Sequence, residues 1–272
     1  MCLLLLGVAA HPDYPLVVAA NRDELYQRDA EPAGFWPDAP HVLGGRDRQA
    51  GGTWLAVTTG GRFAAVTNVR DLSMPAPAHA PSRGFLTTRF VCGDHDPHDY
   101  VAAVSARGAA YAGFNLVVGT ASELWHCDNG RAGRGPTRLG AGVHAVSNAS
   151  LDTPWPKSRR GGAELAALLA QPALDPEDLL ALLGDRSLAP DEALPDTGVG
   201  RELERRLSAV FVAPVPFEQG MYGTRCSTAL LIRRDGEGVL VERSFDAEGR
   251  PGGTARVLFR AGTDVPAALA GP

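Results

Sequence analysis

The segment TWLAVTTGGRFAAVTN, residues 53–68, constrains the fold of this chain more than any other stretch. Two β-rich, apolar runs flank Gly60 and Gly61, and a glycine pair supplies the positive φ that a tight hairpin turn requires at both central residues. FNLVVGTASELWHC at 114–127, with a turn at 119–122, and STALLIRRDGEGVLVERS at 227–244, with a turn at 235–236, repeat the pattern. Antiparallel strand pairs are therefore predicted to dominate the fold.

Two shorter apolar runs open the chain, at residues 2–8 and 16–20. Pro12 and Pro15 between them turn the chain and prevent a helix, so both runs are predicted to be buried strands. The strand segments are too apolar to face water on both sides. Each predicted sheet must therefore be covered on at least one face.

Helices are predicted between the hairpins, at residues 82–91, 97–106 and 161–184. Within the last segment, DPED at 175–178 provides a capped, acidic helix start. The Pro-rich and Gly-rich stretches 72–81 and 185–200 are predicted to be long surface loops.

Neither of these loops separates regions that look independently foldable, and the sequence contains no repeat. The 272 residues are long enough to bury a sizeable core. We therefore expect one domain over residues 1–272, an α+β fold of stacked antiparallel sheets covered by helices.

Composition excludes several classes of protein. With 44% hydrophobic and 21% charged residues the chain is typical of globular proteins, and a net charge of −5 argues against nucleic-acid partners. Four cysteines without a C-x-x-C spacing favour a reducing compartment. The apolar run 3–10 lacks a basic lead-in for a signal peptide and is too short to cross a bilayer, and no longer run follows. A cytoplasmic protein without a membrane span is expected.

Familiar catalytic motifs for phosphate, acyl or zinc chemistry do not occur in the sequence. GRAGRG at 130–135 is glycine-rich but has no strand-to-helix setting for phosphate binding. CGDHDPHDY at 92–100 contains possible metal ligands, His95 and His98 among them, yet its glycine and proline favour a solvated turn between helices. No metal and no resident cofactor are predicted.

The best candidate for chemistry is Cys2, at the start of the first predicted strand. The second strand leads into Arg22 and Asp23, and adjacent strands can bring the three together; the alternative is a strand end that meets water. An arginine favours the thiolate form of a cysteine. Removal of Met1 would expose an α-amine that can accept the thiol proton, as in N-terminal nucleophiles.

Polar residues recur where other predicted inner strands end. Asn68 follows AAVT and Asn148 follows VHAVS, and each is either a turn residue or a donor to an oxyanion. Arg225 is a further cation before the buried run STALLI. Active sites are often assembled at such positions.

Five ordered motifs resemble the NRDE family, also called the transport and Golgi organisation protein 2 family. They are NRDE at 21–24, GGTWLAV at 51–57, TNVRD at 67–71, SNASLDTPWPK at 147–157 and YGTRCST at 222–228. The resemblance covers residues 2 to about 232. It implies a four-layer αββα fold of the N-terminal-nucleophile hydrolase type, and a more distant similarity to cysteine amidases such as penicillin V acylase and bile salt hydrolase.

The same resemblance implies roles for the candidate residues. Cys2 would be the nucleophile, Arg22 and Asp23 the partners of its thiolate and amine, and Arg225 a supporting cation. Asn68 and Asn148 would bind the oxyanion and orient the amine. In the amidases the Arg and Asp are spaced apart, whereas here they are contiguous; because strand neighbours point to opposite faces, Asp23 is the least secure assignment.

Two functions follow as hypotheses. The first is an amidohydrolase that cleaves a non-peptide amide of an acylated amine through Cys2. The second, suggested by the family's links to haem movement and lipid metabolism, is a non-catalytic carrier of haem or another amphipathic small molecule; a purely structural role is a third. A small molecule is the expected partner in the first two, and the sequence leaves the oligomeric state open.

Overall fold

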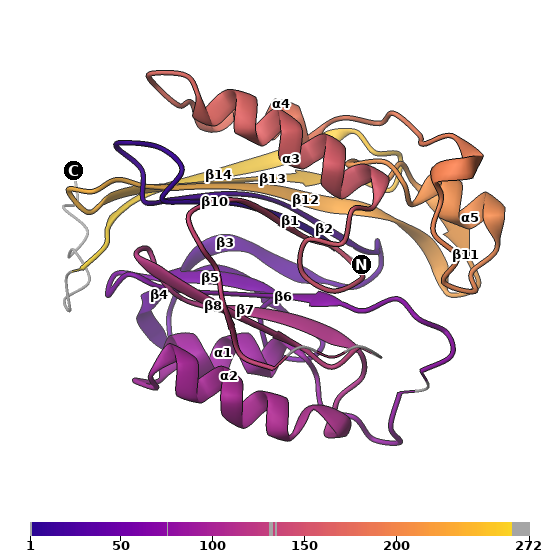
Figure 1. Ribbon diagram of the computed structural model, residues 1–272, viewed down its shortest axis with the longest axis horizontal. Helices are drawn as coiled ribbons and strands as arrows, with labels where there is room; N and C mark the ends of the chain where they lie inside the picture. The colour runs from indigo at the N-terminus through magenta and orange to yellow at the C-terminus, as the bar shows by residue number, and fades with distance from the viewer. Residues whose placement is uncertain (1, 75, 131–132, 134, 263–272) are drawn as a thin grey trace.

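The computed structural model describes residues 2–74, 76–130, 133 and 135–262, and these form two antiparallel sheets stacked face to face (Figure 1). Met1, parts of the 72–81 and 130–135 loops, and residues 263–272 of the expected domain lie outside the described residues. Every pair of adjacent described strands is antiparallel.

Each sheet has seven strands. Sheet I has the order β10 (Gly142–Val146), β1 (Cys2–Val8), β2 (Leu16–Leu25), β12 (Gly220–Ile232), β13 (Glu237–Phe245), β14 (Pro251–Arg260), and β11 (Val215–Phe217) also pairs with β12. Sheet II has the order β3 (Ala30–Trp36), β4 (Ala39–Asp47), β5 (Leu55–Thr58), β6 (Arg62–Asn68), β7 (Phe114–Thr120), β8 (Glu123–Asp128), β9 (Thr137–Arg138).

Helices cover the outer faces of both sheets. Sheet I carries α3 (Pro156–Leu169) and α4 (Pro176–Leu183), and sheet II carries α1 (Gly84–Cys92) and α2 (Pro97–Ala106) (Figure 1). The short α5 (Arg201–Arg206) lies near β11, and the 3₁₀ turns are η1 (Gly108–Ala110) and η2 (Asp191–Ala193). The predicted four-layer αββα architecture is confirmed.

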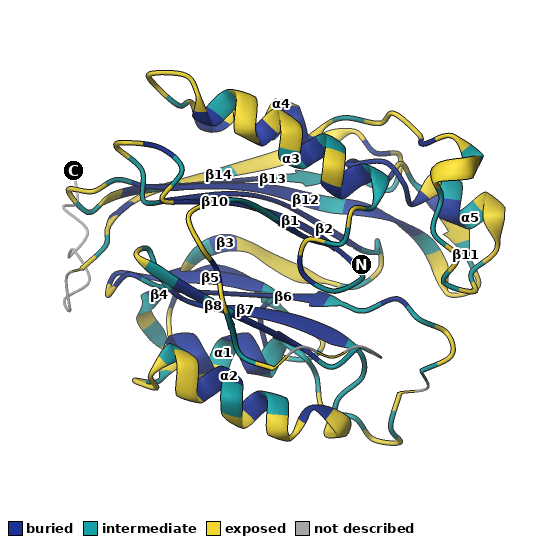
Figure 2. Ribbon diagram, viewed as in Figure 1, coloured by how far each residue is buried: buried dark blue, intermediate teal, exposed yellow. Residues whose placement is uncertain are grey.

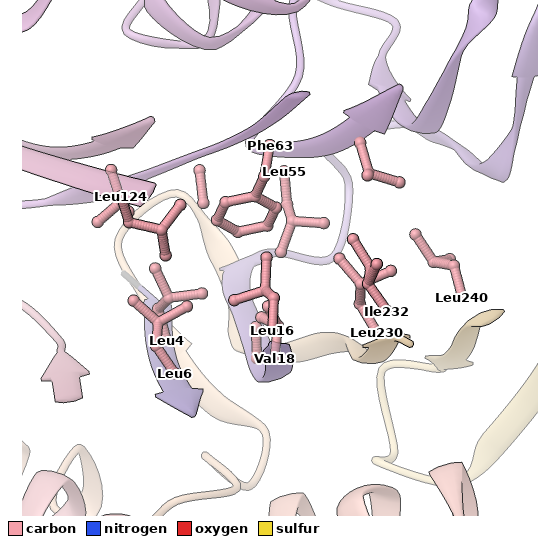
Figure 3. Close-up of a cluster of buried hydrophobic side chains, with 14 of the residues drawn as sticks. Leu4, Leu6, Leu16, Val18, Leu55, Phe63, Leu124, Leu230, Ile232 and Leu240 are labelled. Carbon is pink, nitrogen blue, oxygen red and sulfur yellow. The ribbon is translucent and has the colours of Figure 1, made fainter. Parts of the chain in front are cut away.

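Strand β1 shows why its sequence is a continuous apolar run. Leu4 and Leu6 belong to the core between the two sheets, whereas Leu3 and Leu5 belong to the core beneath α3 and α4. The strand is buried on both faces (Figure 2), so period-two alternation brings its leucines into an apolar environment on either side, and Figure 3 shows Leu4 and Leu6 in the core between the sheets. The predicted inner strand is confirmed.

Helix α3 packs against β1 at unusually short range. A Cβ atom on Gly161 would lie 2.8 Å from Cδ1 of Leu5, so glycine at this position permits the close approach. The same approach brings Lys157, in the first turn of α3, to a buried position between this helix and sheet I.

The three predicted hairpins are confirmed as β5–β6, β7–β8 and β12–β13. The details of one turn differ. Gly61 has a φ of 80° and its N–H donates to Thr58 O at 2.9 Å, which makes Thr59 and Gly60 the central residues. The predicted positive φ at Gly60 is wrong, because the turn closes one residue earlier than the glycine pair suggests.

Several other predicted boundaries also changed. Helices are present at the expected places: the two stretches GGAELAALLAQ and DPEDLLALLG of 161–184 lie in α3 and α4, and α3 begins earlier than predicted, at Pro156. Asp175 caps the second, since its side chain accepts from Glu177 N at 3.0 Å. Strand β2 does not end before Arg22 but continues to Leu25, where it pairs with β12. The reading of residues 21–24 as a strand end in water is therefore wrong.

Candidate functional site

A cavity of about 780 Å³ opens between the two sheets at the end where β1 begins. Five of the six candidate residues line it: Cys2, Arg22, Asp23, Asn68, Arg225. The sixth, Asn148, is fully buried behind the wall formed by Asn68. The fold thus gathers residues from β1, β2, β6 and β12, with the loop after β10, at one place.

The register of three strands fixes the neighbours of Cys2. Cys2 pairs with Arg22, and Arg22 pairs on its other side with Cys226. A β-bulge at Arg225 shifts the register between Thr224 and Cys226. Because a bulge adds one residue to one strand, Thr224 and Cys226 are able to face opposite sides of the sheet.

Arg22 and Asp23 follow this alternation. The guanidinium of Arg22 lies 3.7 Å from Asp47 Oδ2 of β4, on the side of sheet II. The carboxylate of Asp23 lies 3.9 Å from Lys157 Nζ of α3, on the helix side, and accepts from Thr224 Oγ1 at 2.7 Å. Strand neighbours thus point in opposite directions, yet both residues lie beside Cys2 because that residue stands at the end of its strand.

The thiol of Cys2 is almost completely buried, with 6% of the residue exposed. Burial raises its pKa above the ordinary cysteine value; Asp23 adds to the increase, whereas Arg22 and a hydrogen bond from the Asp23 backbone oppose it. The net direction is upward, so the thiol is held protonated. A nucleophilic role therefore requires a base that removes its proton.

Asp23 is held in a polar setting although it is fully buried. Burial raises the pKa of its carboxyl, and the ammonium of Lys157 is the main opposing influence. Burial in turn lowers the pKa of Lys157 to about 8, against the attraction of Asp23. Burial therefore disfavours the charged form of both members of this pair.

Asn148 connects Lys157 to the cavity wall. Its amide nitrogen donates to Asn68 O at 3.0 Å, and its carbonyl oxygen accepts from Lys157 Nζ at 3.5 Å and from Ser147 Oγ at 3.3 Å. Ser147 Oγ also lies 3.3 Å from Cys2 O. The side chain of Asn148 is thus occupied by the protein, whereas Asn68 itself lines the cavity.

Arg225 supports the chain that follows β2. Its Nη1 donates to three backbone carbonyls, Leu25 O at 3.0 Å, Tyr26 O at 2.6 Å and Arg28 O at 2.9 Å. The guanidinium also lies 5.5 Å from the centre of the Tyr26 ring. In this structure Arg225 contacts the turn that shapes the cavity rim.

The other cysteines have different environments. Cys92 is exposed and Cys127 is buried in the core under α1 and α2. Cys226 lines the cavity, but burial raises its pKa well above the ordinary value and the neighbouring Glu242 adds to the effect. Since Cys2 and Cys226 are separated by one intervening strand, their Cα atoms are roughly 10 Å apart, too far for a disulfide.

Sequence reasoning missed three residues that the structure brings to the site, Lys157, Thr224 and Arg83. The first two stand in the family motifs at 147–157 and 222–228, but nothing in those motifs indicates which strand or helix lies opposite. Arg83 lies in the loop before α1 and lines the cavity. An isolated arginine between a proline-rich stretch and a helix gives no signal in one sequence.

The segment CGDHDPHDY lies away from this cavity. Asp96 caps α2 by accepting from Asp99 N at 3.0 Å, and donor atoms of Asp96, His98 and Asp99 lie within 4.8 Å of one another on the exposed surface. His95 stacks on Tyr100 at 5.3 Å between ring centres. The interpretation as a solvated turn leading into a helix agrees with these contacts.

Within the described residues, no helix has both the length and the apolar character needed to cross a membrane.

Comparisons with known proteins place this geometry in context. A family model described as Transport and Golgi organisation 2 matches residues 1–247. The Transport and Golgi organization protein 2 homolog of Bos taurus is 36% identical over 262 residues, and that of Homo sapiens is 34% identical. In both cases the alignment covers 90% of this chain and 93% of the relative.

Among solved structures, a variant of conjugated bile acid hydrolase from Clostridium perfringens is similar with a TM-score of 0.47 and 8% sequence identity. The match covers 94% of this chain and 92% of that chain.

Proposed function

Because the chain belongs to the Transport and Golgi organisation 2 family, we propose that it is a cysteine amidohydrolase of the N-terminal-nucleophile type. Its substrate is a non-peptide amide of an acylated amine, and its nucleophile is Cys2 after removal of Met1. The observation that carries the proposal is the position of Cys2 at the wall of the cavity, paired with Arg22 and next to Asp23.

The first step requires a base because burial keeps the thiol of Cys2 protonated. The α-amine of the processed chain takes the thiol proton, since the ordinary pKa of an α-amine, about 7.7–8.0, suits a base near neutral pH. The thiolate attacks the amide carbonyl carbon and forms the C–S bond of a tetrahedral intermediate. Asp23 stabilises the ammonium that results, and Arg22 stabilises the thiolate.

The negative charge then resides on the former carbonyl oxygen. Asn68 lines the cavity and its amide nitrogen is our assignment for the oxyanion donor. Asn148 supports Asn68 through the bond to its carbonyl at 3.0 Å and is assigned an orienting role. Arg225 is assigned the role of fixing the turn at the rim.

Collapse of the intermediate breaks the C–N bond. The α-ammonium gives its proton to the departing amine, which leaves the acyl group on Cys2 as a thioester. A water molecule, deprotonated by the same α-amine, attacks the thioester and releases the carboxylic acid and the thiol. No further reactant is needed.

Mass spectrometry of the native protein tests the proposal directly. We expect a mass that lacks Met1 and, with an acyl-ester probe, a thioester adduct that maps to Cys2 and is absent in Cys2→Ala. Cys226→Ala is the matched control, because this cysteine lines the same cavity but is not next to the chain start. Retention of Met1 in active protein, or an adduct on Cys226 alone, would refute the mechanism.

A carrier function for haem or another amphipathic molecule is the second candidate. It is favoured by Cys2 and His79, which line the same cavity, since a thiolate and an imidazole both ligate haem iron. Absorbance titration with haem checks it: a Soret shift that is lost in Cys2→Ala supports carriage. Absence of a shift in both proteins excludes it.

A further inference from the structure

Four of the five arginines that line the cavity are occupied by protein groups. Arg28 bonds Asp47 at 2.7 Å, and Arg46 holds Asp38 through two bonds of 2.6 and 2.8 Å. Arg22 lies 3.7 Å from Asp47, and Arg225 donates to three backbone carbonyls. The fifth, Arg83, is different.

Within the described part of the chain, the one hydrogen bond of the Arg83 side chain is from Nη1 to Gly113 O at 2.8 Å, and no carboxylate lies within 4.0 Å of it. A guanidinium has five N–H donors and stays protonated in proteins. Arg83 lines the cavity, and most of its donors have no hydrogen-bond partner among the described residues.

Close packing of two glycines fixes the position of Arg83. A Cβ atom on Gly52 would lie 2.7 Å from the carbonyl carbon of Gly84, so the loop before β5 touches the first residue of α1 directly. Arg83 precedes that residue and is tied to Gly113 at the same time. The first turn of α1 contains no acidic residue, so nothing there neutralises the arginine.

Arg83 and Cys2 line the same cavity. Burial lowers the pKa of the guanidinium, and negative charge at Cys2 and, less strongly, at Glu24 would act in the opposite direction. The cavity thus holds a partly buried cation in the same space as the proposed nucleophile, and partial burial favours pairing of that cation with an anion.

Among the described residues, no carboxylate of the cavity forms an ion pair with Arg83, although Glu24 acts on its charge from a longer distance. Glu24 accepts from Leu25 N at 2.8 Å and lies 3.9 Å from Arg28. Glu31 lies 3.4 Å from Arg48, and Glu242 accepts from Ala33 N at 2.8 Å. These contacts leave Arg83 available to an anionic ligand in the cavity.

We propose that Arg83 binds a carboxylate of the substrate, so that the protein acts on acylated amines that carry a carboxylate close to the scissile amide. The identification of the ligand as a substrate rests on the proposed hydrolase function. The binding of a carboxylate by Arg83 is tested without it. A carboxylate is favoured because its two oxygens match the planar fork of a single guanidinium.

Alkylation of Cys2 by two reagents of nearly equal size tests the subsite. Iodoacetate carries a carboxylate and iodoacetamide does not, and peptide mapping by mass spectrometry gives the rate at Cys2 for each. Any change in the thiolate fraction alters both rates equally, so the ratio of the rates isolates the recognition of the carboxylate. The reaction needs neither Met1 removal nor turnover, so it remains informative if the hydrolase mechanism fails.

In Arg83→Gln we expect the iodoacetate to iodoacetamide ratio to decrease roughly tenfold, the size of a lost charge-assisted hydrogen bond. Arg83→Lys keeps the charge, so its ratio should lie between those of Arg83→Gln and wild type. It also tests the proposal if Arg83→Gln does not fold. Arg46→Gln is the matched control, since Arg46 lines the cavity but is held by Asp38, and its ratio should stay within about twofold of wild type. A ratio that is the same in wild type, Arg83→Gln and Arg83→Lys would overturn the proposal.

Discussion

Two buried ion pairs lie a short distance apart in this protein and differ in geometry. Arg70 Nη2 and Glu204 Oε2 are 2.6 Å apart, with side chains 6% and 3% exposed, and Glu204 also accepts from Thr197 N at 2.8 Å. Lys157 Nζ and Asp23 Oδ2 are 3.9 Å apart, with 1% and 0% exposed. The tight pair joins the loop after β6 to α5, whereas the loose pair lies beside Cys2.

The difference indicates two uses of buried charge. A short, well bonded pair holds the loop after β6 against α5, and breaking it leaves a charge without compensation. A long pair compensates desolvation poorly, which is why the pKa of Asp23 is raised and that of Lys157 is lowered to about 8. Groups whose pKa values are shifted by burial together with a specific charge partner are typical of functional sites.

The largest expected effect comes from the tight pair. Glu204→Gln leaves Arg70 buried without its carboxylate and should lower the free energy of unfolding by about 4 kcal/mol. Urea denaturation at pH 7 measures it. Under native conditions the rate of Cys2 alkylation should stay within about twofold of wild type, and a stability loss below about 1 kcal/mol would remove the distinction between the pairs.

The loose pair, Lys157 and Asp23, should make the free energy of unfolding depend on pH. The folded-state pKa of Lys157 is about 8 and the ordinary value is 10.5, so between these values the unfolded chain binds more protons and stability increases with pH. From pH 8 to 9.5 wild type should gain about 2 kcal/mol relative to Lys157→Met. Denaturation at several pH values measures this. The same pH dependence of the free energy of unfolding in both proteins would contradict the lowered pKa of Lys157.

Removal of the lysine should cost little stability at neutral pH. In Lys157→Met the buried Asp23 is able to take up a proton, so we expect a loss of less than about 1 kcal/mol. The pH profile of Cys2 alkylation should shift downward, because protonation of Asp23 removes a negative charge that raises the pKa of the thiol. An unchanged profile in a folded variant would restrict Lys157 to a structural role.

The smallest effect on stability is expected from the exposed ion pairs of Glu202. Glu202, two positions before Glu204 in α5, forms exposed ion pairs with Arg205 at 2.6 Å and with Arg206 at 2.9 Å. Glu202→Gln should change the free energy of unfolding by less than about 0.5 kcal/mol. Denaturation at low and high salt checks this, and a large effect would show that α5 is held by its surface rather than by Arg70.

Much of the fold is predictable because it depends on local patterns. The hairpins follow from β-rich runs around turn residues, and α4 follows from its Asp175 cap and acidic first turn. Strands β3 and β4 were not predicted, because the former is largely exposed and interrupted by Pro32, so its sequence resembles a loop. Its pairing with β4 and the contact of Ala33 with Glu242 hold it in place.

For the site, the sequence by itself determined the residue types and their order: Cys2 before a buried strand, Arg22 and Asp23 in the next, and the two asparagines at later strand ends. The tertiary structure alone decided that Asn148 lies behind Asn68, that the bulge at Arg225 turns Thr224 toward Asp23, and that Lys157 and Arg83 belong to the same region. The reason is physical. A strand's own period fixes which faces its side chains take, but which cation lies opposite depends on how elements far apart in the chain pack together.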